Sequence, residues 1–297
     1  MIQSFYRRRA LLVLALIANL LASACASAQS GELYRKKSEF NLVIVRQSED
    51  GIRQLLFEDG GAVQTAIDMN DPPRLVHAYA RAIMASLAVA PTPQRIMIVG
   101  LGGGVMPAFL RRNFPDAQID IAELDPEVFA VAKRFFNFRE DPKMKVYVGD
   151  GRKFIEQTAN RYDIIYLDAY GADSIPYMLA TKEFMTAVRA KLADGGIAVS
   201  NVWGPSSNRL YASMLRTYEA VFAELHVVRA PYSENRILIA LTAKKSLTQK
   251  KLVELANQIE PNLKPRLDLG GMIEAGYQSP GIVGGGTVLL DKDAPKE

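Results

Sequence analysis

From Arg95 onward, short apolar stretches alternate with amphipathic ones, and this alternation constrains the fold more than any other feature. Five stretches have the length and composition of buried β-strands: "RIMIVG", "QIDIAEL", "KVYVGD", "YDIIYLD" and "GIAVSNV". Helix-like stretches such as "VMPAFLRRNF" and "PEVFAVAKRFF" stand between them. Strands and helices that alternate in this way form a parallel sheet with helices on both faces. We therefore predict a doubly wound, mostly parallel α/β domain over residues 73–245.

A smaller β unit precedes this domain. The stretches "EFNLVIVRQ", "IRQLLFE" and "AVQTAID" are rich in β-forming residues, and the glycine-containing breaks between them are hairpin signals. The sequence thus predicts an antiparallel β-hairpin unit over residues 31–72. The stretch "DPPRLVHAYARAIMASLAVA" should then form a helix that begins at Pro72-Pro73. Residues 246–297 are predicted to hold a C-terminal amphipathic helix and a loop-like tail.

The N-terminus has the three parts of an export signal in their usual order. Arg7-Arg8-Arg9 precede a 15-residue apolar run, and Ala26-Ser27-Ala28 provides a small-residue cleavage site. The run is shorter than the roughly 20 residues that span a bilayer. We predict a cleaved signal peptide over residues 1–28 and a periplasmic protein. The alternatives are lipidation at Cys25 and an uncleaved membrane anchor, and Arg8-Arg9 also resembles the core of a twin-arginine signal.

Charge and metal-ligand content exclude two classes of function. The first 28 residues hold three of the 36 basic residues and no acidic residue, which leaves 33 basic against 32 acidic residues elsewhere. Such a balance gives no basic surface for nucleic acid. Cys25 is the only cysteine, and His77 and His226 are the only histidines. Carboxylates would have to complete any zinc site, so we predict no metal.

The segment "IMIVGLGGGVMPAF" places a bare backbone directly after the first predicted strand of the α/β domain. In this architecture ligands bind beyond the carboxyl ends of the strands, and glycine lets a ligand approach the backbone closely. Gly100, Gly102 and Gly104 form a G-x-G-x-G pattern, while Val105 stands where the dinucleotide fingerprint requires a third glycine. The turn therefore favours a nucleoside or its sulfonium over a pyrophosphate.

An acidic residue follows each of three further strands. Glu123 can accept both ribose hydroxyls, Asp150 can accept from an adenine amino group, and Asp168 ends the fourth strand. Each carboxylate could instead cap the helix that follows it. All three together, behind a glycine turn, favour a nucleoside site.

These segments, in this order, resemble the spermidine synthase (polyamine aminopropyltransferase) family, which has the class I S-adenosylmethionine-dependent fold. The resemblance covers roughly residues 38–242. It implies S-adenosylmethionine or its decarboxylated form as co-substrate, a small amine or polyamine-like acceptor, and a homodimer through the N-terminal unit. Asp168 is implied to be the catalytic base that takes a proton from the amine. The residues implied to hold the donor are Gly100, Gly102, Gly103, Gly104, Glu123, Asp150 and Gly151.

The chain departs from the family pattern at three acids. Gly103 stands where the family has an aspartate that grips the donor amino group, and Gly171 and Arg81 replace two acids that bind the polyamine. These losses argue against putrescine as acceptor and indicate a divergent branch. The remaining candidates for contacts with the acceptor are Gln64, Tyr79, Asp173 and Tyr177.

Three hypotheses of function follow. The first is a transferase that moves an aminopropyl group to an amine-type acceptor. The second is methyl transfer from S-adenosylmethionine, which the loss of the aspartate at Gly103 favours because that donor retains its carboxylate. The third is a non-catalytic, exported binding protein that keeps the nucleoside fold. A hydrolase is disfavoured because the chain has no G-x-S-x-G elbow.

Overall fold

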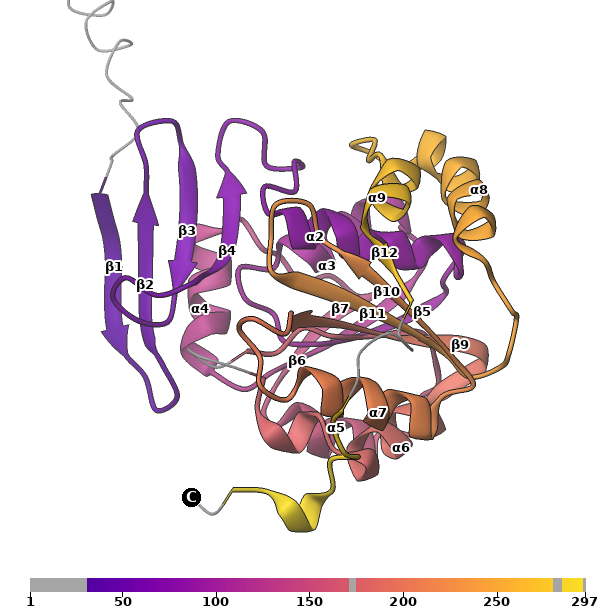
Figure 1. The fold of residues 1–297 in the computed structure, drawn as a ribbon. Helices are drawn as coiled ribbons and strands as arrows, with labels where there is room; N and C mark the ends of the chain where they lie inside the picture. Colours follow the sequence, from indigo (N-terminus) through magenta and orange to yellow (C-terminus); the bar gives the residue numbers. More distant parts are fainter. Residues whose placement is uncertain (1–30, 171–174, 280–284, 296–297) are drawn as a thin grey trace, which may run out of the picture.

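The computed structural model describes residues 31–170, 175–279 and 285–295, and its centre is an eight-stranded sheet with the order β12-β10-β11-β9-β8-β5-β6-β7 (Figure 1). Five of its strands are parallel: β5 (Arg95–Val99), β6 (Gln118–Glu123), β7 (Met144–Val148), β8 (Tyr162–Leu167) and β9 (Leu192–Trp203). Three antiparallel strands complete one edge: β10 (Glu224–Arg229), β11 (Asn235–Leu241) and β12 (Tyr277–Gln278). The predicted doubly wound, mostly parallel sheet is confirmed.

Helices cover both faces of this sheet (Figure 1). One face carries α3 (Val105–Asn113), α8 (Gln249–Ile259) and α9 (Leu269–Gly276), and the other carries α5 (Gly151–Gln157), α6 (Lys182–Ala190) and α7 (Tyr211–Val221). Successive side chains of a strand point to opposite faces. Accordingly, Ile96 and Ile98 of β5 belong to one hydrophobic core, whereas Met97 and Val99 belong to the other.

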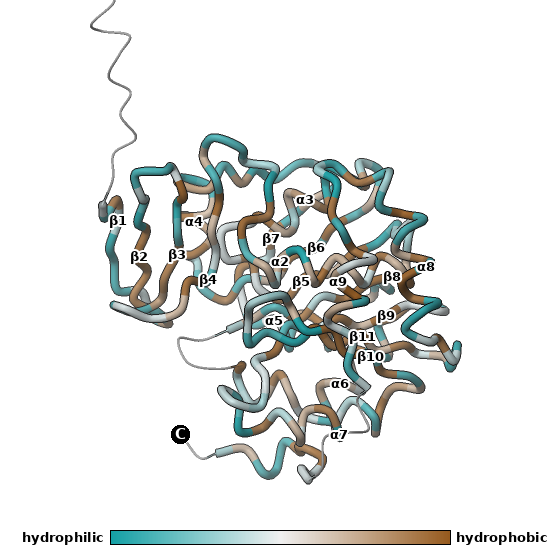
Figure 2. The backbone as a smooth tube through the Cα atoms, turned by 45° about the horizontal axis from the view of Figure 1, so that its top comes forward, coloured by the Kyte–Doolittle hydropathy of each residue, from teal (hydrophilic) through white to brown (hydrophobic). Residues whose placement is uncertain are grey.

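The predicted β-hairpin unit is a four-stranded antiparallel sheet, β1 (Gly31–Lys37), β2 (Leu42–Gln47), β3 (Ile52–Leu56) and β4 (Val63–Asp68). It packs on α4 (Pro126–Phe135) through a third hydrophobic core. Strand β1 was not expected; it is hydrophilic, lies at the outer edge and pairs only with β2 among the described strands (Figure 2). Within the described ranges, no helix is long and apolar enough to cross a bilayer.

The helix expected from Pro72-Pro73 begins later. Helix α2 covers Ala78–Ala82 and continues as the 3₁₀ helix η1 (Ile83–Ala88). The preceding turn is held to β4, because Leu75 bridges to Ile67 and Arg74 forms a salt bridge with Asp68 at 2.7 Å. Helix α9 and strand β12 were also not predicted. The expected export segment, residues 1–28, lies outside the described residues.

Candidate functional site

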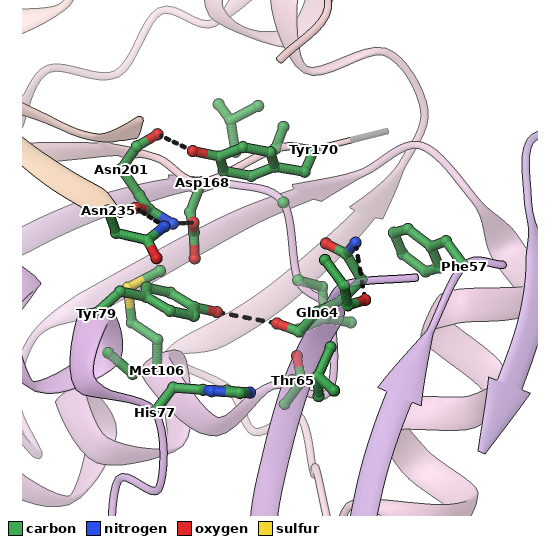
Figure 3. A pocket seen from close by; sticks show the side chains of 18 of the residues that line it. Phe57, Gln64, Thr65, His77, Tyr79, Met106, Asp168, Tyr170, Asn201 and Asn235 are labelled. Carbon is green, nitrogen blue, oxygen red and sulfur yellow. Dashed lines mark hydrogen bonds between the residues drawn. The ribbon is translucent and has the colours of Figure 1, made fainter. Parts of the chain in front are cut away.

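A cavity of about 750 Å³ lies beyond the carboxyl ends of β5, β6, β8 and β9 (Figure 3). Strand β4 and the start of α2 form its opposite wall, so both the small sheet and the α/β domain contribute to it. This volume lies within the range of small-molecule sites. Six predicted donor or catalytic residues line it: Gly100, Gly102, Glu123, Asp150, Gly151 and Asp168.

The glycine turn brings β5 and β8 together at the edge of the cavity. Gly100 has a φ of +98°, and a Cβ at this position would lie 2.3 Å from the carbonyl oxygen of Asp168. Gly102 has a φ of +54°, a left-handed conformation that a residue with a Cβ adopts only with strain. A larger residue at position 100 would therefore push Asp168 away from the turn.

Gly103 and Gly104, which were expected to contact the donor, lie behind the turn and do not line the cavity. The backbone N–H of Gly103 donates to Thr65 Oγ1 at 2.9 Å. A Cβ on Gly103 would lie 2.6 Å from Thr65 Cγ2 and 2.8 Å from the Phe136 ring, and one on Gly104 would lie 2.5 Å from Phe138. Packing therefore requires glycine at both positions, and Gly104 also has a left-handed φ of +76°. Their contact with a donor stays a prediction.

Glu123 is buried at the end of β6 and holds the neighbouring backbone in place. Its Oε2 accepts from the N–H of Leu101 and its Oε1 from the N–H of Asp125, both at 2.9 Å. Burial raises the pKa of the Glu123 carboxyl. The side chain thus shapes the glycine turn and also reaches the cavity.

Asp150 both caps a helix and lines the cavity. Its Oδ1 accepts from the backbone N–H of Arg152 at 2.7 Å and of Lys153 at 3.2 Å, which makes it the N-cap of α5. The alternative prediction, that a strand-end acid caps the following helix, is therefore confirmed for Asp150. The second carboxylate oxygen has no hydrogen-bond partner within the described ranges, so capping leaves it available.

Asp168 lies at the centre of the cavity wall, held by a chain of amides (Figure 3). Its Oδ1 accepts from Asn201 Nδ2 at 3.0 Å, and Asn201 Oδ1 accepts from Asn235 Nδ2 at 2.8 Å. Burial raises the pKa of Asp168 to about 6, while the hydrogen bond from Asn201 opposes that rise. The carboxyl is therefore ionised above pH 6 and close to its titration range at neutral pH.

Aromatic side chains lie beside Asp168. The Tyr79 hydroxyl donates to the carbonyl of Gln64 at 3.0 Å, and both residues line the cavity, where they were expected. The Tyr170 hydroxyl donates to the carbonyl of Asn201 at 2.8 Å, and its ring lies 5.6 Å from that of Trp203. Both phenol groups therefore donate to backbone carbonyls and not to the Asp168 carboxylate.

Of the two other predicted acceptor residues, Tyr177 lies within the described structure and Asp173 does not. The hydroxyl of Tyr177 donates to the carbonyl of Leu290 at 3.3 Å, and Tyr177 does not line the cavity, whereas its neighbours Pro176 and Met178 do. Tyr177 therefore contacts the C-terminal segment in this structure, and its contact with an acceptor stays a prediction. Asp173 lies outside the described residues.

Sequence reasoning missed Thr65, Asn201 and Asn235. Asn201 lies near the end of the fifth parallel strand, so the rule that identified the strand-end acids could have found it. Thr65 and Asn235 carry no such signal, because they reach the site only through tertiary packing. No group of three or more metal-ligating side chains occurs in the part of the chain that the structure describes.

Comparison with known proteins finds similarity at the levels of family, sequence and fold. A family model described as the spermine/spermidine synthase domain matches residues 76–251. The polyamine aminopropyltransferase of Vibrio vulnificus is 33% identical over 261 residues, which cover 84% of this chain and 86% of that protein.

Two solved structures have similar folds. The probable spermidine synthase of Corynebacterium glutamicum has a TM-score of 0.71 at 21% identity and covers 91% of this chain and 99% of its own. Human methyltransferase-like protein 13 in complex with SAH has a TM-score of 0.58 at 28% identity and covers 63% of this chain and 93% of its own.

Proposed function

The chain belongs to the spermine/spermidine synthase family, and on this premise we propose that it is a transferase that moves an aminopropyl group from an adenosyl sulfonium to an amine. The observation that carries the proposal is the position of Asp168, whose backbone touches the glycine turn and whose carboxylate borders the same cavity. A nucleophile bound at Asp168 would therefore lie beside a donor bound at the turn.

The residues that would hold the donor are Gly100, Gly102, Glu123, Asp150 and Gly151. The glycine turn allows close approach of the backbone, and the free Asp150 oxygen can accept from an adenine amino group. Decarboxylated S-adenosylmethionine or S-adenosylmethionine would supply an electrophilic carbon on a positively charged sulfur. The SAH bound in human methyltransferase-like protein 13 supports an adenosyl ligand in a fold of this kind.

Asp168 would act on the amine in two steps. A primary amine has a pKa near 10 and is mostly an ammonium at neutral pH, which cannot attack carbon. The Asp168 carboxylate first holds this cation. It then takes one proton from the ammonium, which frees the nitrogen lone pair. That lone pair bonds to the donor carbon while the carbon–sulfur bond breaks and its electrons stay on sulfur, so the products are a secondary ammonium and a neutral thioether.

Titration calorimetry and an activity assay test this proposal. We expect 5′-methylthioadenosine, which both donors contain, to bind the purified protein. Asp168→Asn should reduce transfer to amines by roughly 10²–10⁴-fold, the usual contribution of a general base. Asp194→Asn, at an exposed position near the start of β9, is the control. Full activity in Asp168→Asn would exclude the proposed base and leave the non-catalytic binding protein as the better hypothesis.

Methyl transfer is the second candidate, and the packing of Gly103 favours it. Thr65 and Phe136 fill the space that an aspartate would need there, so the carboxylate expected to hold a decarboxylated donor has no room. Calorimetry with S-adenosylmethionine and its decarboxylated form separates the two. Tighter binding of the decarboxylated donor would contradict methyl transfer.

We also propose export through residues 1–28. The mass of the protein from a periplasmic fraction should correspond to a chain that begins at Gln29. A lipid-modified Cys25, or the mass of the uncleaved chain, would contradict cleavage at Ala28. If the twin-arginine route is used, replacing Arg8 and Arg9 by lysine should block export.

A further inference from the structure

The wall of the cavity around Asp168 is aromatic and neutral. Tyr79 and Tyr170 lie near the carboxylate in Figure 3, and Trp203 packs on Tyr170. The two polar side chains behind Asp168, Asn201 and Asn235, are amides. Ring faces attract a cation and pack well on an apolar body. This part of the cavity therefore suits one ammonium group carried on an apolar frame.

Only one carboxylate on the described cavity wall is available to bind the ammonium group of an acceptor. Among those lining residues the acids are Glu123, Asp150 and Asp168. Both oxygens of Glu123 accept backbone N–H groups, and Asp150 caps α5 near Gly151 on the donor side. Within the described ranges the second oxygen of Asp168 has no hydrogen-bond partner, and the carboxylate lies near the aromatic rings of Tyr79 and Tyr170 (Figure 3). A second ammonium would have no carboxylate of its own on this wall.

A fixed cation also lines the cavity. Arg81 Nη1 donates to the carbonyls of Leu75 at 2.7 Å and Val76 at 2.6 Å, and these two bonds hold the guanidinium at the start of α2. Its Nε and Nη2 have no hydrogen-bond partner within the described ranges. Because the guanidinium is always charged, it repels a second ammonium whatever the pH.

We propose that the acceptor is a monoamine, with one ammonium at Asp168 and an apolar or aromatic body between Tyr79, Tyr170 and Trp203. This inference rests on the proposed function and adds the class of acceptor. A diamine of the same length fits the aromatic slot equally well, but the described cavity wall offers its second charge the Arg81 guanidinium and no carboxylate beyond those assigned to the donor. Charge, and not length, distinguishes the two acceptors.

A matched pair of amines tests the proposal. Butylamine and putrescine share a four-carbon chain and differ by one amino group. Calorimetry at pH 8, with the protein saturated by 5′-methylthioadenosine, should show butylamine binding at least tenfold more tightly than putrescine. Phenethylamine should bind at least as tightly as butylamine, because its ring packs on the aromatic wall.

Variants of Arg81 give the second arm of the test. Arg81→Glu should raise the affinity for putrescine at least tenfold and leave that for butylamine within threefold. Arg81→Gln keeps a side-chain donor for the carbonyls of Leu75 and Val76 and should give an intermediate ratio. Arg112→Glu, the same charge change on an exposed position of α3, should change neither affinity.

The outcomes separate the inference from its premise. If 5′-methylthioadenosine does not bind, the proposed function fails and the inference fails with it. If it binds but neither amine does, or putrescine binds as tightly as butylamine, the monoamine proposal is overturned while the nucleoside site stands. If the protein prefers putrescine and this preference disappears in Asp173→Asn, then Asp173 binds the second ammonium group. That result would also overturn the monoamine proposal.

Discussion

Asp168 shows how one residue combines a chemical role with a cost in stability. Its carboxyl follows the end of β8. Burial raises its pKa to about 6, although the hydrogen bond from Asn201 lowers the pKa. A raised pKa suits a group that must take up a proton near neutral pH. The same shift means that the folded protein binds this proton more tightly than the unfolded chain does. The charged carboxylate therefore destabilises the fold above pH 6.

Replacing Asp168 should stabilise the protein in a pH-dependent way. Between pH 3.8 and about 6 the folded state holds more protons than the unfolded state, so the stability that this group contributes falls as pH rises through that window. Asp168→Asn should raise the free energy of unfolding by roughly 1–3 kcal/mol at pH 8 and leave it nearly unchanged at pH 4. Urea unfolding at both pH values measures this, and a stabilisation of equal size at pH 4 would contradict the titration argument.

Gly103 gives a second prediction at this scale. Its φ is not in the left-handed region, so the backbone there accepts any residue and only packing requires glycine. Gly103→Asp should lower the free energy of unfolding by about 1–3 kcal/mol, the usual cost of overpacking. Adding Thr65→Ser, which removes the Cγ2 atom 2.6 Å from the new Cβ, should restore part of the loss. No recovery in the double variant would show that Phe136 or the buried charge dominates.

At the scale of elements, α5 shows a helix terminus serving two purposes. Asp150 caps the helix with Oδ1, while Oδ2 has no hydrogen-bond partner within the described ranges and the residue lines the cavity. Asparagine caps a helix about as well as aspartate, so Asp150→Asn should change stability by only a few tenths of a kcal/mol. Its amide would present N–H donors where the free oxygen was, and 5′-methylthioadenosine should bind roughly fivefold more weakly, since a lost hydrogen bond is worth about 1 kcal/mol.

Asp150→Ala separates the two purposes of this residue. It removes the cap as well, so stability should fall by about 1 kcal/mol together with affinity. Calorimetry and thermal unfolding of both variants give the comparison. Wild-type affinity in Asp150→Asn would restrict Asp150 to capping.

The elements that the sequence predicted well are those whose own residues carry the signal. The five parallel strands are apolar runs bounded by turn residues, and both faces of the inner strands β5, β6, β8 and β9 are largely buried, whereas β7 lies at the sheet edge. Helix α2 was placed too early because Leu75 fits the helical periodicity but bridges to Ile67 of β4. Strand β1 is polar, and only its pairing with β2 makes it a strand.

The residues of the candidate site also fall into those that the sequence could indicate and those that it could not. Glu123, Asp150 and Asp168 could be placed at one edge because the carboxyl ends of parallel strands meet there. Asn235 donates to Asn201, the partner of Asp168, only because β11 pairs antiparallel with β9, a register that no local pattern indicates. Gly104 matches the spacing of the motif, but it packs against Phe138 and is not among the residues that line the cavity.

At the scale of the whole molecule, the small sheet and the α/β domain form one cavity and share one core. Val43, Val45 and Phe57 of the small sheet pack with Val128 and Val131 of α4. The hydrogen bond from Gly103 to Thr65 links the same two parts at the glycine turn. Because the core is continuous across this boundary, neither part keeps its packing when the other unfolds.

We therefore expect one cooperative thermal transition for the whole chain, measured by calorimetry. Val45→Ala, in the buried core between β2 and α4, should lower the free energy of unfolding by about 2 kcal/mol, as large-to-small core changes do. The single transition should therefore occur at a lower temperature. Val148→Ala, 49% exposed on β7, is the matched control and should have little effect. A nucleoside at 100 times its Kd should raise the free energy of unfolding of the whole chain by about 2.7 kcal/mol. Two transitions, of which the nucleoside shifts only one, would mean that the small sheet is not required to form the site.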